Sequence, residues 1–500
     1  MSQIPTYVTA VPNGTEKVRI VRRMYLQEVI TETNRQGLYM AVDLGGTNFR
    51  VCSIHLHGNS TFSLTQSKVP IPRELMVAKT SKELFSFLAK QIQEFLKAHH
   101  HEHYQSTVRR RMTVTSPNGF QDEEIFNLGF TFSFPVHQVG INKGTLIRWT
   151  KGFDIADAVG KDVCALLQDE IDALHLPVRV AALVNDTVGT LMARSYTSPG
   201  KTGTLLGAIF GTGTNGAYVE KLENVKKMTS STEVGDYDKT TGNMIVNTEW
   251  GSFDNSLSVL PKTPYDEALD KESVNPGIQM FEKRISGMFL GEILRRALLT
   301  LVKDPKVALF SDSDSSSNDV HSTTCIEEKS PLFEQWGLDT SFLSIAHADN
   351  SQGLKVTRQT LDRDYGVQAA SAEDAEAVKI IAAAIGKRAA RLSAVAIAAV
   401  ILATDKLKKP QDIATADSEV VNEDDVVDVG VDGSLVEFYP GFEEYIREAF
   451  VEIEGIGKHG EQRIRIGIAK DGSGVGAALI ALVADKVSKL AAIKETERGD

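Results

Sequence analysis

Two short stretches of this chain have the residue types of phosphate-binding turns, and they resemble each other. The first is Asp43-Leu44-Gly45-Gly46-Thr47-Asn48-Phe49-Arg50, and the second is Phe210-Gly211-Thr212-Gly213-Thr214-Asn215-Gly216. Glycine lets the backbone approach a phosphate closely, while Thr hydroxyls and Asn amides add hydrogen-bond donors that backbone amides alone do not supply. We name these stretches the first cradle and the second cradle.

The segments around both cradles predict how they are positioned. An apolar extended run precedes each one (residues 38–42 and 205–209), and a second extended run follows (50–56 and 217–220), which predicts two strand-turn-strand units. A dinucleotide fingerprint or a Walker loop leads into a helix instead. Two hairpin cradles therefore predict two lobes that close on one nucleotide.

Composition indicates a globular enzyme and argues against several other classes. The chain has 500 residues, of which 42% are hydrophobic, so it can bury a large core and is long enough for two or more domains. Its net charge of -12 argues against nucleic acid as a partner, because phosphate backbones favour clustered Lys and Arg. Cys52, Cys164 and Cys325 are far apart, which fits a reducing compartment and predicts no zinc site.

The hydropathy pattern predicts neither a membrane partner nor a leader. The longest apolar stretch, within Ala389 to Ala403, is short for a membrane span and is predicted to be a buried helix. The amino-terminal residues contain no apolar segment of signal-peptide length. We expect a cytoplasmic protein.

The chain alternates strand-like and helix-like segments, which favours an α/β fold. Residues 81–98 are predicted to be helical, and residues 128–134 are predicted to form a strand that ends at Pro135. Two polar tracts, 311–318 and 405–428, are predicted to be surface loops, and the tail after Lys486 is predicted to fray.

Nine motifs spread over the chain together resemble the eukaryotic hexokinases, most closely the fungal glucokinases. This resemblance is far more specific than either cradle alone and spans residues 43 to about 484. It implies an α/β, two-lobed, actin-like (ribonuclease H-like) fold with a sugar and nucleotide cleft between the lobes. The motifs are Asp43 to Arg50, Leu128 to Pro135, Trp149 to Phe153, Asn185 to Thr187, Gly211 to Asn215, Asn247 to Gly251, Asn275 to Gly277 with Glu282-Lys283, Val431 to Ser434, and Asp471 to Gly474.

The resemblance also implies a division of the chain. Residues 1–36 form an N-terminal segment, residues 37–186 the small lobe and residues 187–473 the large lobe. Residues 474–500 are expected to form a helix that returns to the small lobe, followed by the tail.

Asp186 and Lys151 are the predicted catalytic residues. Asp186 follows the apolar run 181–184, which places it at the end of a strand, and the resemblance implies that it accepts the proton of the sugar 6-hydroxyl. Such general-base help contributes roughly 10²–10⁴-fold to the rate. Lys151 is predicted to stabilise the transferring phosphoryl group. The alternatives are that Asn185-Asp186-Thr187 only caps a helix over 188–194, and that Lys151 is a solvated surface lysine.

Sugar recognition requires many directed hydrogen bonds around an uncharged ring, so polar residues should converge from several segments. Glu249 and Glu282 can each accept from two hydroxyls, although a single Glu is usually a surface residue. Trp250 and Phe134 fit either a pocket lining or the core. The sugar-binding positions that match the family are Ser133, Phe134, Thr150, Lys151, Asn185, Asp186, Asn215, Glu249 and Glu282.

For ATP, the resemblance assigns residues of both cradles and of a third segment on the adenosine side. Asp43 is expected to hold the hydrated Mg²⁺, through water, although an Asp here could also be a simple turn acceptor. Residues 471–476 are either another cradle or a helix start whose glycines allow close packing. The nucleotide positions are Asp43, Gly45, Gly46, Thr47, Asn48 and Arg50, then Thr212 and Gly213, then Gly433 and Ser434.

Residues 18–36 depart from the family pattern. A family segment like Pro12 to Lys17 normally runs almost directly into the strand that begins near Gly37 here. The inserted stretch begins with Val, whose codons start with GT, and ends with Gln, one of whose codons is CAG. We hypothesise a retained intron, and a transcript that contains these codons in full-length form would contradict this. The alternative is a genuine basic helix.

The resemblance predicts ATP-dependent phosphorylation of glucose, and of related hexoses, at the 6-hydroxyl, the entry step of glycolysis. Sugar binding would close the lobes and exclude water. A second class is an actin-like or chaperone-like ATPase, which would turn over ATP without sugar. A third is a non-catalytic hexokinase-like glucose sensor, whose catalytic or nucleotide-binding groups we would expect to be altered.

Overall fold

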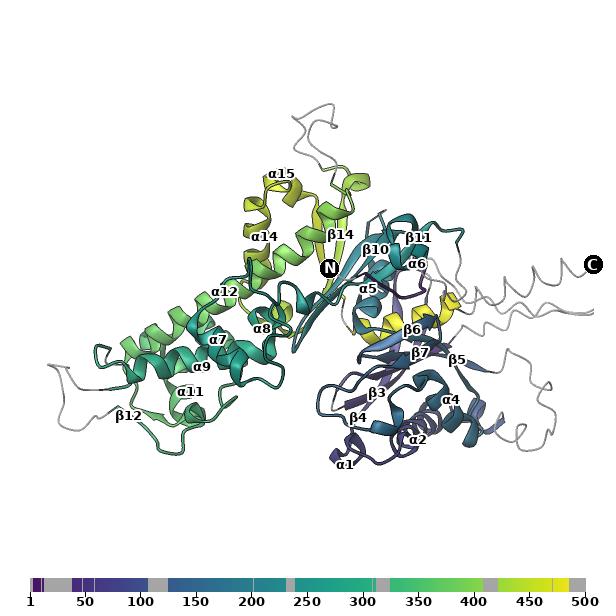
Figure 1. Ribbon diagram of the computed structural model, residues 1–500, viewed down its shortest axis with the longest axis horizontal. Coiled ribbons are helices and arrows are strands. Elements are labelled where there is room, and N and C mark those ends of the chain that lie inside the picture. Colours follow the sequence, from purple (N-terminus) through teal and green to yellow (C-terminus); the bar gives the residue numbers. More distant parts are fainter. Residues whose placement is uncertain are drawn as a thin grey trace, which may run out of the picture.

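The computed structural model describes residues 3–9, 11–12, 38–46, 48–57, 59–106, 125–200, 202–230, 239–307, 309–311, 324–407, 421–469 and 471–484. Several predictions concern residues outside this set: the insert 18–36, Thr47 of the first cradle, most of both polar tracts, and the tail after Lys486. Figure 1 shows two bodies, each built around a sheet.

The first sheet has the strand order β4-β3-β2-β5-β8, in which β2 runs parallel to β5 and antiparallel to β3. Side chains alternate along β2: Met40 and Val42 face one core, while Tyr39 and Ala41 face another. Helices α2 and α4 cover the first of these faces. The bounds are β2 (Leu38–Leu44), β3 (Asn48–Leu56), β4 (Phe62–Pro70), β5 (Phe126–Phe132), β8 (Val178–Val184), α1 (Arg73–Met76), α2 (Ser81–His99), α4 (Val163–Ala173), and the hairpin β6 (Val136–Gly140) and β7 (Lys143–Leu146).

The second sheet has the strand order β1-β11-β10-β9-β14-β15, so the first strand of the chain joins a sheet whose other strands lie between Thr204 and Ile468. Strand β9 pairs antiparallel with β10 and parallel with β14. The carboxyl ends of β9 and β14 therefore lie side by side. The bounds are β1 (Ile4–Pro5), β9 (Thr204–Phe210), β10 (Thr214–Lys221), β11 (Asn243–Asn247), β14 (Val427–Asp432) and β15 (Ile464–Ile468).

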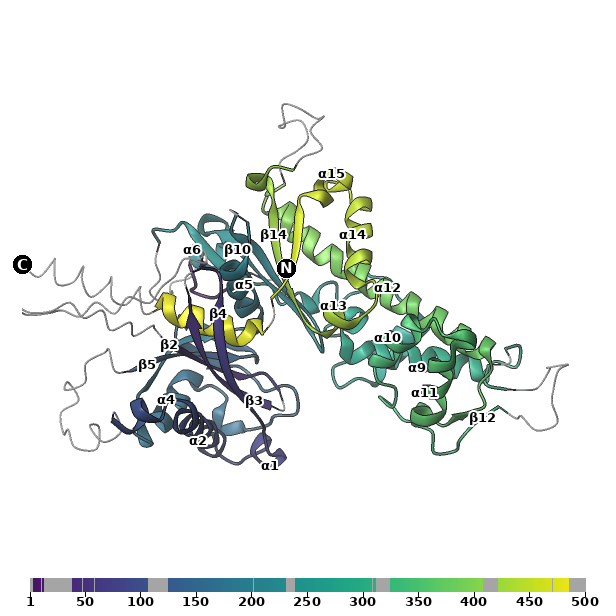
Figure 2. The same ribbon diagram turned by 180° about the vertical axis from the view of Figure 1, so that it is seen from behind.

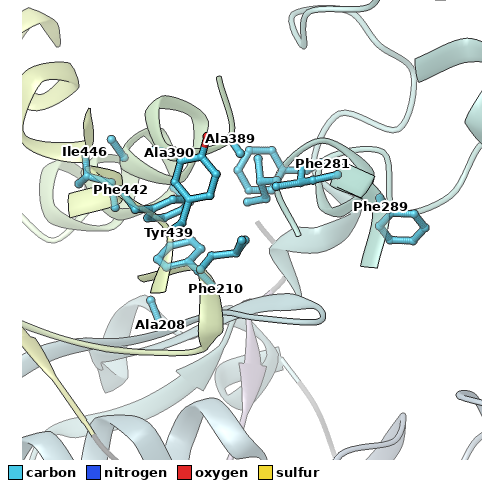
Figure 3. Packing of buried hydrophobic residues seen from close by; sticks show 14 of the residues in the cluster. Ala208, Phe210, Phe281, Phe289, Ala389, Ala390, Tyr439, Phe442 and Ile446 are labelled. Carbon is cyan, nitrogen blue, oxygen red and sulfur yellow. The ribbon is translucent and has the colours of Figure 1, made fainter. Parts of the chain in front are cut away.

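Helices pack on one face of the second sheet and extend away from it. Figure 3 shows Ala208 and Phe210 of β9 against Tyr439, Phe442 and Ile446, in one buried cluster with α12. The bounds are α6 (Lys226–Ser230), α7 (Pro264–Glu272), α8 (Glu282–Ile285), α9 (Gly287–Lys303), α10 (Ser341–Ala348), α11 (Lys355–Tyr365), α12 (Ala372–Ala403), α13 (Ser434–Phe438), α14 (Phe442–Glu452) and α15 (Gly457–Gln462), with the short pair β12 (Cys325–Ile326) and β13 (Val367–Gln368).

Two helices join the sheets: α5 (Asp186–Thr197) and the helix of residues 472–484. They share one buried cluster that also takes in residues of both sheets, among them Ala41 and Ala217. Figure 2 shows the 472–484 helix, in yellow, against the first sheet, far along the sequence from the strands it covers. A Cβ at Gly476 would lie 2.0 Å from the carbonyl oxygen of Gly189, so the two helices cross in close contact. This favours the close-packing interpretation of residues 471–476.

The predicted elements are largely present. The runs before and after both cradles are β2, β3, β9 and β10, the helix predicted over 81–98 is α2, and the buried helix containing residues 389–403 is α12. The strand predicted over 128–134 ends earlier, at Phe132. Ser133 leaves the ladder there, although its N–H still donates to the carbonyl of Leu44 at 3.2 Å. No helix within the described part of the chain is long and apolar enough to cross a membrane.

Candidate active site

The first cradle is the turn between β2 and β3, as predicted. Asp43 lies near the end of β2 and is the register partner of Arg50 in β3. Gly45 and Gly46 form the turn, and Asn48 begins β3. The guanidinium of Arg50 lies 3.9 Å from the carboxylate of Asp471, just before the 472–484 helix. The first cradle thus faces the start of that helix.

The Asp43 carboxylate is held through one oxygen only. Ser473 Oγ donates to Asp43 Oδ2 at 2.9 Å. The other oxygen, Oδ1, is buried and has no hydrogen-bond partner within the described residues. Burial raises the pKa of Asp43; the Ser473 hydrogen bond lowers it, and the nearby Asp186 carboxylate raises it again. An unpartnered carboxylate oxygen beside this glycine-rich turn fits a place for a hydrated cation.

The second cradle is the turn between β9 and β10. The start of α9 braces it, because the Gly287 N–H donates to the Gly211 carbonyl at 2.7 Å and the Met288 N–H donates to the Thr212 carbonyl at 3.1 Å. A Cβ at Gly213 would lie 2.8 Å from Glu282 Oε2. The second cradle therefore lies directly against Glu282, a residue that is predicted to bind the sugar.

Gly433 and Ser434 follow β14 and lie beside the second cradle. Gly433 has φ = 115°, and a Cβ there would lie 2.4 Å from the carbonyl oxygen of Phe210, so only glycine fits this close approach. Ser434 then begins α13. The predicted adenosine segment and the second cradle thus form one continuous edge of the second sheet.

Lys151 connects the first cradle to the end of β5. Its Nζ donates to the carbonyl oxygens of Gly45, at 2.7 Å, and Ser133, at 2.9 Å, and it lies 5.5 Å from the centre of the Phe134 ring. The alternative of a freely solvated lysine does not fit these contacts, although the residue is exposed. Ser133 Oγ is buried and unpartnered within the described structure. Thr150, the residue before Lys151, is half-buried.

Asn185 and Asp186 lie between β8 and α5. Asn185 caps α5, since its Oδ1 accepts from the Thr187 N–H at 3.0 Å and from the Thr187 hydroxyl at 2.6 Å. Asp186 Oδ1 accepts from the same N–H at 2.8 Å. The capping interpretation is thus correct for Asn185. These bonds do not use Asp186 Oδ2, and the charge of Asp186 acts on Asp43, Glu249 and Glu282.

Asn215 of β10, Asn247 of β11 and Glu249 of the turn after β11 form a hydrogen-bonded triangle. Asn215 Nδ2 donates to Asn247 Oδ1 at 2.8 Å and to Glu249 Oε1 at 2.9 Å, and Asn247 Nδ2 donates to the same Glu249 oxygen at 2.9 Å. Glu249 has a left-handed backbone, with φ = 48°. Desolvation by the surrounding protein raises the pKa of Glu249, the Asn247 hydrogen bond lowers it, and Asp186 raises it further.

Glu282, the first residue of α8, completes a group of charged side chains that come from distant segments of the chain. Its Oε2 accepts from the Thr214 N–H of the second cradle at 2.9 Å. Burial raises the pKa of Glu282, as do the carboxylates of Glu249 and Asp186, whereas the Thr214 hydrogen bond and Lys151 lower it. Lys151, Asp186, Glu249 and Glu282 are therefore near enough to act on one another. Asp186 and the two Glu residues are acceptors of the kind that sugar hydroxyls require.

Two aromatic residues that the sequence allowed either in a pocket lining or in the core are buried. Phe134 is 5% exposed and packs edge-on against Trp149 and Phe153. Trp250 is 2% exposed, stacks on Phe210 and donates to Thr214 Oγ1 at 3.0 Å. Trp250 is therefore a core residue that supports the second cradle.

Sequence reasoning did not single out two residues that hold this site together, Asn247 and Ser473. Both lie inside motifs that carry the family resemblance, and this position is the one feature of the sequence that could have indicated their importance. Nothing in a linear pattern shows that their side chains contact Glu249 and Asp43. Within the described segments no group of three or more His, Cys, Asp and Glu could hold a metal. A cation here would thus rely on Asp43, water and phosphate oxygens.

Comparison with known proteins identifies the family. Two family models described as hexokinase match residues 1–196 and 205–483. A glucokinase of Aspergillus niger is 59% identical over 486 residues, covering 97% of this chain and 90% of the relative. Glucokinase-1 of Saccharomyces cerevisiae is 39% identical over 496 residues, covering 97% of this chain and 88% of the relative.

A solved structure agrees. The hexokinase from Schistosoma mansoni, complexed with glucose, superposes with a TM-score of 0.69 at 33% identity, covering 96% of this chain and 88% of that chain. The predicted two-lobed, actin-like α/β fold is confirmed. The matches include both cradles and the residues between them, and the chain belongs to the hexokinase family of enzymes, close to the fungal glucokinases.

Proposed function

We propose that this chain transfers the γ-phosphoryl group of ATP to the 6-hydroxyl of glucose, giving glucose 6-phosphate and ADP. The observation that carries the proposal is the group of Lys151, Asp186, Glu249 and Glu282, which lies between two glycine-rich cradles. The family membership, the glucokinase relatives and the glucose complex of a structural neighbour support the same reaction. The proposal includes related hexoses as further substrates of this site.

Asp186 is the proposed general base. It takes the proton of the sugar 6-hydroxyl as that oxygen forms a bond to the γ-phosphorus and the bond from that phosphorus to the β-phosphate oxygen breaks. Its Oδ1 is fixed by the Thr187 N–H, which leaves Oδ2 to face the hydroxyl. The other residues of the proposed sugar site are Ser133, Phe134, Thr150, Lys151 and Asn185 of the small lobe and Asn215, Glu249 and Glu282 of the large lobe.

The charge of the transferring group needs positive partners. Lys151 is one, and Arg50 of the first cradle is another. Asp43 would hold Mg²⁺ through water, and the bound ion would neutralise charge on the phosphate oxygens. The unpartnered Asp43 Oδ1 fits this role. Gly45, Gly46, Thr47, Asn48, Thr212, Gly213, Gly433 and Ser434 are the proposed nucleotide contacts.

Closure of the lobes on the sugar would bring Lys151 and the first cradle onto the carboxylates of the second lobe and exclude water that would otherwise hydrolyse ATP. The proposed division places residues 37–186 in the small lobe and 187–473 in the large lobe, with residues from 474 on returning to the small lobe. The contact of Ala477 with Gly129 of β5 supports that return.

The test is glucose-dependent ADP formation by the purified chain with Mg²⁺ and ATP, run beside Asp186→Asn. We expect kcat to fall by roughly 10²–10⁴-fold in the variant, with glucose affinity changed far less. Asp169→Asn, at an exposed position of α4, is the matched control and should keep full activity. ATP turnover without sugar would favour an ATPase, and glucose binding without turnover would favour a sensor.

A further inference from the structure

Ser473 contacts the proposed magnesium carboxylate from the opposite end of the sequence. Its Oγ lies 2.9 Å from Asp43 Oδ2, across a separation of 430 residues. The same residue is held from a second side, because Thr131 Oγ1 donates to the Ser473 carbonyl oxygen at 3.1 Å. Thr131 in β5 is the register partner of Asp43 in β2. Ser473 is therefore fixed against β2, which leads into the first cradle, and against the neighbouring strand β5.

The Ser473 hydrogen bond makes the two Asp43 oxygens unequal. Oδ2 accepts from Ser473, whereas Oδ1 is buried without a partner in the described structure. A carboxylate with a free torsion could turn either oxygen toward a ligand. Here the Ser473 hydroxyl holds Oδ2 in place, so Oδ1 is the oxygen that is left for a ligand. Groups that orient a metal-binding side chain in this way typically contribute 10–100-fold to metal affinity or activity.

We propose that Ser473 is a positioning residue for Asp43, and that it presents Oδ1 to the hydrated magnesium ion of the bound nucleotide. This inference rests on the proposed nucleotide site and adds to it a residue that belongs to the helix joining the two sheets. Ser473 acts through Asp43 and contacts neither the sugar nor the transferred group in this proposal.

The test measures binding of ADP rather than turnover. The dissociation constant of ADP for the full chain, saturated with glucose, is determined by calorimetry with excess Mg²⁺ and again with EDTA. The ratio of the two constants is the magnesium coupling. In Ser473→Ala we expect the coupling to fall by roughly 10-fold, with the EDTA value within about 2-fold of wild type. Ser473→Thr keeps a hydroxyl and should restore much of the coupling.

Thr131→Val is the matched control. It removes the other hydrogen bond of Ser473 and keeps the side-chain shape, so it should lower the melting temperature while leaving the coupling unchanged. Coupling of wild-type size in Ser473→Ala would overturn the proposal, and so would an equal loss in both variants, since that would show only that the helix start had shifted. A wild-type chain that binds ADP with no effect of Mg²⁺ would instead refute the magnesium site itself.

Discussion

At the scale of single residues, several side chains of the site have a structural contact and a proposed chemical role at once. Asn185 caps α5 while it lies beside Asp186. Lys151 binds two backbone carbonyls while it presents a positive charge to the site. A residue type alone therefore does not separate a cap from a ligand. The distinction comes from the contacts of the other carboxylate oxygen, or of the side chain's remaining hydrogen-bond donors.

Replacing Asn247 tests how much the proposed sugar site depends on the hydrogen bonds that Asn247 makes with Asn215 and Glu249. Asn247→Ala removes one donor from the Glu249 carboxylate and one acceptor from Asn215. Because hydrogen bonds to charged groups contribute about 1.5–3 kcal/mol, we expect the KM for glucose to rise by roughly 10-fold or more, with a smaller change in kcat. Steady-state kinetics measure this. Asn243→Ala, at the exposed start of the same strand, is the control, and equal effects of both would contradict the prediction.

The carboxylates give glucose binding a defined pH dependence. The pKa values of Glu249 and Glu282 are both raised above 4.5, chiefly by desolvation and also by neighbouring carboxylates, while Lys151 opposes the shift. Ionised carboxylates are the better acceptors for sugar hydroxyls, so affinity should be complete above the raised pKa values. The affinity for glucose should be lost as the pH falls through these raised pKa values, at a higher pH than that at which an ordinary glutamate titrates. Calorimetric titration with glucose across this pH range measures the affinity.

The control for that titration is Glu249→Gln, which removes one of the two groups. It should bind glucose more weakly at neutral pH and show a shallower decline as the pH falls. A wild-type affinity that stays constant down to pH 4.5 would contradict the assignment of these glutamates to the sugar.

At the scale of elements, the position of the site depends on two helices that cross with glycines in contact. A Cβ at Gly476 would lie 2.0 Å from the Gly189 carbonyl oxygen and 2.2 Å from its Cα. Backbone atoms cannot move aside as a flexible side chain can. The crossing holds the start of the 472–484 helix, and with it Ser473, beside the first cradle.

Gly476→Ala should therefore destabilise the protein. Overpacking of this kind costs about 1–3 kcal/mol or more, so we expect a lower melting temperature in a thermal scan. Gly46→Ala is the stability control, because an added Cβ at that position meets nothing within 4 Å. A Gly476→Ala melting temperature equal to that of wild type would show that the helices separate at little cost.

At the scale of the whole molecule, the proposed sugar site depends on charged groups from distant segments of the chain. Lys151 lies in the chain between strands β5 and β8 of the first sheet, whereas Glu249 follows β11 of the second sheet and Glu282 begins α8. The like charges of Asp186, Glu249 and Glu282 repel one another, so a bound sugar that donates hydrogen bonds to them should favour the compact arrangement.

Glucose should accordingly make the molecule more compact. We expect small-angle scattering to give a smaller radius of gyration with saturating glucose than without it. Asp186→Asn together with Glu249→Gln replaces two carboxylates with neutral amides, which are weaker acceptors, and should show little change at the same glucose concentration. An unchanged radius of gyration in the wild-type chain would contradict closure of the lobes on the sugar.

The sequence by itself determined the local elements and the family. Strands β2, β3, β9 and β10 were predictable because apolar runs of this length flank glycine-rich turns, and both features depend on neighbours in the chain. The early end of β5 at Phe132 was not predicted, since aromatic and small polar residues go on alternating to Phe134 and only the neighbouring strand determines where pairing stops. The position of Trp250 in the core likewise depended on Phe210, a partner 40 residues away.

Tertiary structure decided which of the predicted residues act together. The bonds from Lys151 to Gly45, from Glu282 to the second cradle and from Ser473 to Asp43 join segments separated by 106, 68 and 430 residues. Such contacts are made when sheets pair and helices pack, and no local periodicity specifies them. The raised pKa values of Asp43, Glu249 and Glu282 arise in the same way, because desolvation and charge depend on what surrounds a group in space rather than along the chain.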